Sequence, residues 1–153
     1  MNPNFVLLPE AVGTGDVVSK QAILELLAQR FGSAYALDAA DVLERIEERE
    51  RLGSTGFGRG VAIPHARIAG LARPVAVVLR LDAPVNFDSA DGMPVDLVFG
   101  LLSPETAGAA HLQALAAISR MMRDEAMHQS LRQAPGSEAI FGLLSNVIDR
   151  DAA

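Results

Sequence analysis

The chain has 153 residues, of which 50% are hydrophobic and 21% are charged, and this composition is typical of one globular domain. It contains no cysteine, which excludes disulfides, zinc–thiolate sites, iron–sulfur clusters and cysteine nucleophiles and favours a cytoplasmic location. The formal net charge is −6 and no apolar run reaches the length of a bilayer, so neither nucleic-acid binding nor membrane insertion is expected. We expect one domain over residues 1–153, with its core at about 5–149.

The N-terminal third is predicted to contain one short strand and two helices. The apolar run FVLL at residues 5–8 indicates the strand. Apolar residues then recur at helical spacing over residues 20–31, and Gly32 is expected to end this helix. Asp38 is the expected N-cap of a second helix over residues 39–52, whose charged outer face is typical of a solvent-exposed surface.

The middle of the chain is rich in valine and leucine. Residues 61–63, 74–81 and 94–102 therefore read as buried strands. The links between them, residues 66–73 and 82–93, are too short for helical crossovers. We therefore expect a mixed sheet and not a purely parallel one.

The C-terminal part is predicted to be helical. One long helix is expected from about residue 109 to 133, with His128 on its solvent-facing side and without a functional role. A break at a Pro-Gly pair separates it from a final helix over residues 137–149. The order of one strand, two helices, three strands and two helices predicts an α/β fold of three layers, with a mixed sheet between helices.

The segment GSTGFGRGVAIPHAR, residues 53–67, is unusual because four glycines fall within eight residues. Gly53, Gly56, Gly58 and Gly60 could direct several backbone N–H groups at one anion. Neither nucleotide-binding pattern is present, however, because the loop lacks G-K-[S/T] and its spacing is not G-x-G-x-x-G. A strand also follows the glycines, whereas both nucleotide motifs open a helix. A flexible connector remains the alternative interpretation.

His65 is the candidate reactive group of this segment. Pro64 restricts its own backbone and favours an extended Ile63, so the imidazole is expected at the end of a rigid strand. A histidine of ordinary pKa is mostly neutral near pH 7 and has a free lone pair, so it can act as a nucleophile or a base. The alternative is a structural histidine that is hydrogen-bonded under a loop.

Potential donors for a phosphoryl group lie close to His65 in the sequence. A phosphoryl group has three oxygens, and hydroxyl and guanidinium groups are suitable donors to them. His111 begins the long helix and could equally be an ordinary surface residue. The nearby hydroxyl residues are Ser54 and Thr55, and the flanking arginines are Arg49, Arg59 and Arg67.

Three segments resemble the enzyme IIA domain of the fructose/mannitol class of the bacterial phosphotransferase system. They are RERLGSTGFGRGVAIPHAR at residues 49–67, PVDLVFGLLSP at 94–104 and HLQALAAISRMM at 111–122. The likeness is greatest to the free-standing nitrogen-regulatory branch of that family, and it covers nearly the whole chain. The G-S-T-G and A-I-P-H elements are highly specific, whereas the final helix is generic.

The resemblance implies a site and a partner. His65 would be the phosphorylated nucleophile, His111 would support the phosphate from across the site, and Arg49 would contribute to the phosphate environment. Thr55 is a further candidate hydroxyl donor. The phosphate donor would be an HPr-type phosphocarrier, and no cofactor or metal is implied. The implied fold is again a mixed sheet between helices.

Two functions are compatible with this resemblance. In the first, the phosphorylation state controls binding to a regulated protein, such as a transporter or a sensor kinase, in nitrogen or potassium metabolism. In the alternative, the chain is a sugar-specific IIA component that passes phosphate to a separate IIB protein. A binding module with a decayed site and a serine hydrolase are less favoured, since the candidate residues are intact and no G-x-S-x-G elbow is present.

Overall fold

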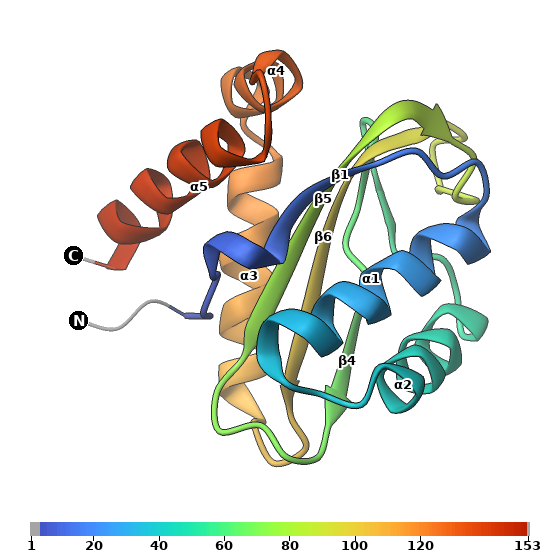
Figure 1. Ribbon diagram of the computed structural model, residues 1–153, viewed down its shortest axis with the longest axis vertical. Helices are drawn as coiled ribbons and strands as arrows, with labels where there is room; N and C mark the ends of the chain where they lie inside the picture. Colours follow the sequence, from blue (N-terminus) through green and yellow to red (C-terminus); the bar gives the residue numbers. More distant parts are fainter. Residues whose placement is uncertain (1–3, 153) are drawn as a thin grey trace.

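The computed structural model describes residues 4–152 and contains a six-stranded mixed sheet between two groups of helices (Figure 1). The short 3-10 helix η1 (Pro9–Ala11) precedes the first strand. The strands are β1 (Val12–Gly15), β2 (Gly56–Gly58), β3 (Val61–Ala62), β4 (His65–Ile68), β5 (Val75–Val85) and β6 (Val95–Pro104). The helices are α1 (Lys20–Tyr35), α2 (Ala39–Arg51), α3 (Ala109–Met122), α4 (Glu125–Gln133) and α5 (Ser137–Ala152).

The antiparallel pair β5 and β6 forms the centre of the sheet. β1 lies parallel to β5 on one side, while β3 and β4 lie one after the other along β6 and are both parallel to it. β2 completes the order as the antiparallel partner of β3. The mixed sheet predicted from the short links is thus confirmed.

Each face of the sheet is covered by helices, as the three-layer prediction required (Figure 1). Neighbouring residues of β5 contribute to opposite cores: Val77 and Leu79 pack with α1 and α2, whereas Ala76 and Val78 pack with α3 and α5. This alternation is the period of two expected for a strand that is buried on both faces. The valine-rich strands therefore stabilise two separate layers of packing.

The strand predicted at residues 5–8 is wrong. That segment forms only an isolated bridge, between Val6 and Val75, and the strand that joins the sheet is VGTG at β1. The side chain of Arg30 on α1 covers β1, because a Cβ at Gly13 would come within 2.5 Å of its Nη2 atom. VGTG contains one apolar residue and two glycines, so apolarity alone failed to locate the strand.

Gly32 does not end the first helix, contrary to prediction. α1 continues to Tyr35 and ends at Ala36, which has a left-handed φ of 56°. Gly32 instead faces the beginning of the next helix, because a Cβ there would lie 3.1 Å from the carbonyl oxygen of Leu37. The predicted N-cap of the second helix is confirmed, since the Asp38 carboxylate accepts the backbone N–H groups at residues 40 and 41.

The long helix predicted over residues 109–133 is two helices, α3 and α4. Asp124 begins the second one, because its carboxylate accepts the N–H groups of Ala126 and Met127. This change of direction places His128 inside the protein, where it is only 1% exposed, so its predicted solvent-facing position is also wrong. The final helix, by contrast, begins at residue 137 as predicted.

Across the described part of the chain, no helix has both the length and the apolar character required to cross a membrane.

Candidate functional site

The position of His65 is determined by two short strands that pair with the same neighbour. β3 pairs with β6 at Leu97 and Val98, and β4 resumes the pairing with His65 opposite Leu101. Pro64 occupies the link between the two strands, and its carbonyl oxygen accepts the N–H group of Leu101 at 2.9 Å. His65 is therefore held at the first position of a paired strand, whereas the sequence predicted it at the end of the preceding strand, with residues 66–73 as a link.

A backbone carbonyl fixes the protonation pattern of the His65 ring. Nδ1 lies 2.8 Å from the carbonyl oxygen of Ile63. Because a carbonyl oxygen can only accept a hydrogen bond, Nδ1 carries the proton and Nε2 keeps the lone pair. The pKa of His65 is lowered overall: burial lowers it, as does the charge of Arg49, whereas the Ile63 carbonyl and the charge of Glu50 raise it. The ring is therefore neutral near pH 7, with Nε2 available for attack.

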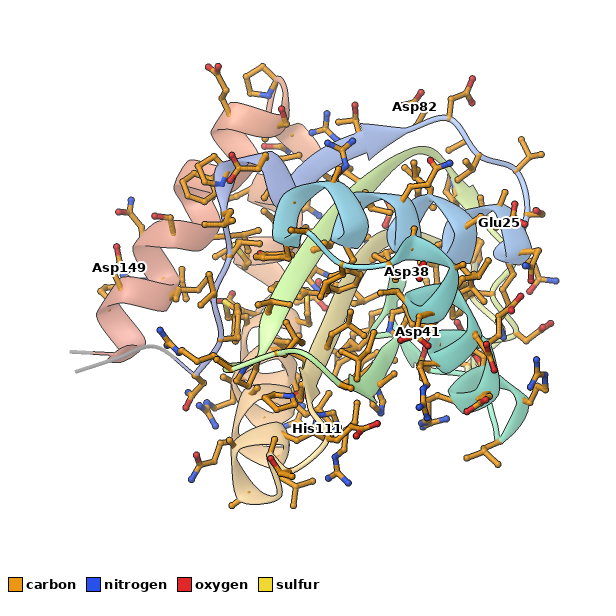
Figure 2. All side chains as sticks on the ribbon, turned by 60° about the horizontal axis from the view of Figure 1, so that its bottom comes forward. Glu25, Asp38, Asp41, Asp82, His111 and Asp149 are labelled. Carbon is orange, nitrogen blue, oxygen red and sulfur yellow. The ribbon has the colours of Figure 1, made fainter. Side chains whose placement is uncertain are left out.

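His111 lies at the N-terminal end of α3 (Figure 2), and its ring contacts that of His65. The two ring centroids are 5.7 Å apart and the ring planes are inclined by 50°. His111 is buried, and its Nδ1 atom is 2.7 Å from the hydroxyl oxygen of Ser103 at the end of β6. Burial, together with the nearby His65 and Arg67, lowers the pKa of His111 to about 4. Both imidazoles of the site are thus neutral at physiological pH.

An open groove of about 450 Å³ leads to the two histidines. Arg49 enters it from the last turn of α2, and its Nη1 group donates a 2.9 Å hydrogen bond to the carbonyl oxygen of Gly53. The groove thus combines two neutral imidazoles with cationic side chains, an arrangement suited to a phosphoryl group. Its lining residues are Arg45, Glu48, Arg49, Leu52, His65, Ala66, Arg67 and His111.

Thr55 lies beneath the groove and not in its lining. It is 8% exposed, and both its N–H group and its hydroxyl donate hydrogen bonds to the carboxylate of Glu50. The hydroxyl of Ser54 is likewise engaged, because it donates to the carbonyl oxygen of Phe87 at 2.8 Å. The structure therefore brings Arg49, His65 and His111 together but leaves the predicted hydroxyl donors outside the groove.

Two glycines of the glycine-rich segment belong to the turn that joins β2 to β3. Gly58 and Gly60 have φ angles of 106° and 85° and form the turn between β2 and β3. Beside this turn, Arg59 forms a 3.0 Å ion pair with Glu125 at the beginning of α4. Gly58 and Gly60 thus belong to a hairpin turn that contacts α4 through Arg59. Arg67, unlike Arg59, does line the groove.

Two contributors to the site were not anticipated from the sequence. Ser103 contacts the ring of His111, and Glu50 binds Thr55 and also forms a 2.9 Å ion pair with Lys20. Ser103 falls within PVDLVFGLLSP, which gave a signal for the family but not for this contact. Glu50 is one of many charged residues on α2, so nothing in its sequence position distinguishes it. Among the residues that the structure describes, no group of three or more metal-ligating side chains is found.

Comparison with known proteins gives an independent result. A family model described as "Phosphoenolpyruvate-dependent sugar phosphotransferase system, EIIA 2" matches residues 7–147. The chain therefore belongs to the EIIA type 2 family. This membership agrees with the fold and with the resemblance drawn from the three sequence segments.

Several members of the EIIA type 2 family are similar to the chain over most of its length. A nitrogen regulatory protein from Pseudomonas aeruginosa is 45% identical, over 84% of each chain. One from Bradyrhizobium diazoefficiens is 42% identical, over 92% of each chain. The crystal structure of nitrogen regulatory protein IIA-Ntr from Neisseria meningitidis has a TM-score of 0.84 and 36% identity, covering 91% of this chain and 96% of that one. A fructose-specific EIIA component from Haloferax volcanii is more distant, at 31% identity over 86% of each chain.

Proposed function

We propose that the chain is a regulatory EIIA protein that accepts a phosphoryl group on Nε2 of His65 from an HPr-type phosphocarrier. The observation that carries this proposal is the hydrogen bond of Nδ1 to Ile63, which leaves Nε2 with its lone pair beside His111 and Arg49. The nitrogen regulatory relatives support a regulatory role, and family membership supports exchange with an HPr-type donor. We place this exchange in the cytoplasm.

The transfer is a displacement at phosphorus between two histidines. The Nε2 lone pair of His65 forms a new N–P bond while the bond from phosphorus to the donor histidine breaks. The electron pair of that broken bond returns to the donor nitrogen, and Nδ1 of His65 keeps its proton on the Ile63 carbonyl. The ring gains positive charge as the N–P bond forms, and this carbonyl stabilises that charge.

The groove supplies donors to the oxygens of the transferred group. A loose, metaphosphate-like transition state spreads negative charge over three equatorial oxygens, so fixed donors around it lower the barrier. Arg49 has further N–H groups besides the one bound to Gly53, and Arg67 lies in the same groove. We propose that the Ser103 hydroxyl donates to Nδ1 of His111, so that Nε2–H of His111 faces the phosphoryl group.

Phosphorylation would change the charge that this surface presents to a partner. A phosphoryl group adds about 1.5 to 2 negative charges to a groove that is lined by three arginines and one glutamate. A partner that binds the unmodified cationic groove would therefore be released, and one that needs negative charge would be recruited. This supports control of a regulated protein, such as a transporter or a sensor kinase.

Phosphorylation by enzyme I, an HPr-type carrier and labelled phosphoenolpyruvate tests the proposal. We expect an acid-labile label on the wild-type chain, none on His65→Ala, and a slower, incomplete label on His111→Ala. A second EIIA protein of known activity in the same reaction establishes that the donors are competent. Retention of the label by His65→Ala would refute the assignment, and an unlabelled wild type with competent donors would refute the function.

The sugar-transport alternative is favoured by one observation, the similarity to the fructose-specific EIIA component. In that case the phosphate would pass to a separate IIB protein, because the chain has no cysteine of its own to receive it. Single-turnover transfer from the phosphorylated chain to a purified fructose-type IIB distinguishes the two functions. We expect transfer at least 100-fold slower than from a fructose EIIA, and comparable rates would favour the alternative.

A further inference from the structure

Glu50 is a buried carboxylate in the last turn of α2, adjacent in sequence to Arg49. Its side chain is only 5% exposed, and it does not line the groove that contains His65. The carboxylate accepts the N–H of Thr55 at 3.2 Å on each oxygen and also accepts the Thr55 hydroxyl. Lys20 supplies the compensating charge at 2.9 Å. Glu50 is therefore paired by groups that do not line the groove.

A continuous set of hydrogen bonds connects Glu50 to the reactive ring. The carbonyl oxygen of Thr55 accepts the N–H group of Ile63 at 2.9 Å. The carbonyl oxygen of Ile63 in turn accepts Nδ1–H of His65 at 2.8 Å. Glu50 holds Thr55, Thr55 holds Ile63, and Ile63 holds the imidazole. The hydrogen bonds from Ile63 to Thr55 and from His65 to Ile63 have ordinary lengths, so displacement of Thr55 changes the position of the groups that follow it.

Packing alone does not explain why a charged side chain is buried at Glu50. Burying an ion pair costs desolvation energy, and apolar side chains of similar volume often stabilise a core equally well. Lys20 is also held in place, since its Nζ atom lies 4.7 Å from the centre of the Phe87 ring. A carboxylate at this position gives what an apolar side chain cannot, namely simultaneous acceptors for the N–H and the hydroxyl of Thr55. The pairing thus indicates that Thr55 must be held in one orientation.

We propose that Glu50 is a positioning residue for phosphoryl transfer, which acts through Thr55 and Ile63 to hold His65 with Nδ1 protonated and Nε2 in the groove. The expected change in the rate of phosphoryl transfer rests on the proposed function, whereas the expected change in the tautomer of His65 does not. Misplacement of a reacting atom by about 1 Å can reduce a rate about 100-fold. Glu50 therefore controls the rate of transfer without touching the phosphoryl group.

The first measurement is the tautomer of His65 in the unphosphorylated protein, read from the ¹⁵N and ¹H NMR shifts of the imidazole. We expect the wild type to show the Nδ1–H form and Glu50→Gln to show a mixture of both tautomers. Glu44→Gln is the matched control, because Glu44 is an exposed carboxylate on the same helix. The control variant should retain the wild-type shifts, since it loses the same charge without loosening Thr55.

The second measurement separates positioning from donor binding. Because Glu50 lies outside the groove, Glu50→Gln should reduce the rate of labelling at saturating phosphocarrier by about 10-fold and leave the KM for the carrier unchanged. Glu44→Gln should change neither value. Wild-type tautomer and rate in folded Glu50→Gln would overturn the proposal. A change confined to KM would also overturn it.

A second variant covers the case in which Glu50→Gln does not fold. Thr55→Val removes the hydroxyl bond to Glu50, and Thr55→Ser keeps it. The valine variant should shift the tautomer in the same direction and the serine variant should not, and identical shifts in both would overturn the proposal. If competent donors leave the wild type unlabelled, the proposed function fails, while the tautomer comparison still decides whether Glu50 positions the ring.

Discussion

A single carbonyl oxygen determines how His65 can react. Its contact with Nδ1 leaves Nε2 with the free lone pair of the proposed nucleophile, and burial lowers the pKa so that this lone pair stays unprotonated. His111 has no comparable carbonyl partner and contacts the hydroxyl of Ser103, which can donate as well as accept. The proposed function therefore assigns the two histidines different roles, attack on phosphorus for His65 and hydrogen-bond donation for His111.

The lowered pKa values predict how stability depends on pH. In the unfolded chain a histidine titrates near pH 6.5, whereas His111 in the folded protein titrates near 4. Between these values the unfolded state binds more protons, so the free energy of unfolding decreases as the pH falls through this window. His111→Gln should reduce the decrease in the urea midpoint between pH 7 and pH 5, with Glu44→Gln as the control. Equal decreases in His111→Gln and wild type would contradict the assigned shift.

At the scale of elements, the hairpin of β2 and β3 joins the sheet to α4. Arg132 of α4 donates to both carboxylate oxygens of Asp96, at 2.9 and 3.1 Å, and to the carbonyl oxygen of Arg59 at 3.1 Å. Gly60 leaves room for this guanidinium, because a Cβ there would lie 2.7 Å from Nη2 of Arg132. Part of the glycine-rich segment is thus explained by helix docking and not by phosphate binding.

The Arg132–Asp96 pair should contribute measurably to stability. Both side chains are partly buried and the contact is bidentate, so a double-mutant cycle should give a coupling of about 1–2 kcal/mol in urea unfolding. The exposed pair of Arg45 and Glu105, at 3.5 Å, is the comparison and should give about 0.5 kcal/mol or less. Equal couplings would show that the contact with α4 adds nothing beyond a surface ion pair.

At the scale of the whole molecule, two exposed apolar side chains flank the groove. Leu52 lines it and is 84% exposed, while Leu112 follows His111 and is 64% exposed. Val18 is similarly exposed but follows β1 at the other end of the sheet, near Asp82; Figure 2 shows Asp82 far from His111. A protein donor must contact the rim of the groove, so apolar residues there are suited to docking it.

Replacement of these two leucines should weaken donor binding. Leu52→Ser and Leu112→Ser should each raise the KM for the phosphocarrier by about 5- to 30-fold, which corresponds to the loss of about 1–2 kcal/mol of interface energy. The labelling rate at saturating carrier should remain near that of the wild type, because neither side chain holds His65. Val18→Ser is the matched control and should leave the KM unchanged. An equal effect of all three variants would place the docking surface elsewhere.

Local signals in the sequence were sufficient for the main outline of the fold and for the choice of His65 as the candidate reactive residue. Short links between valine-rich segments indicated a mixed sheet, because a parallel connection needs a longer crossover. The Ile63-Pro64-His65 run predicted an imidazole at the end of a rigid strand, since proline restricts the backbone on both sides. These properties depend on neighbouring residues, so they can be read without knowledge of the rest of the molecule.

Only the tertiary structure decided which groups meet. Gly13 belongs to a strand because β1 pairs with β5, and an apolar pattern does not record that pairing. Parallel pairing of β4 with β6 sets Arg67 opposite Ser103, and the hydroxyl of Ser103 contacts His111. The Thr55 hydroxyl likewise donates to Glu50 and does not line the groove. The sequence shows only that this hydroxyl is present, whereas the packing of the folded chain determines which acceptor it contacts.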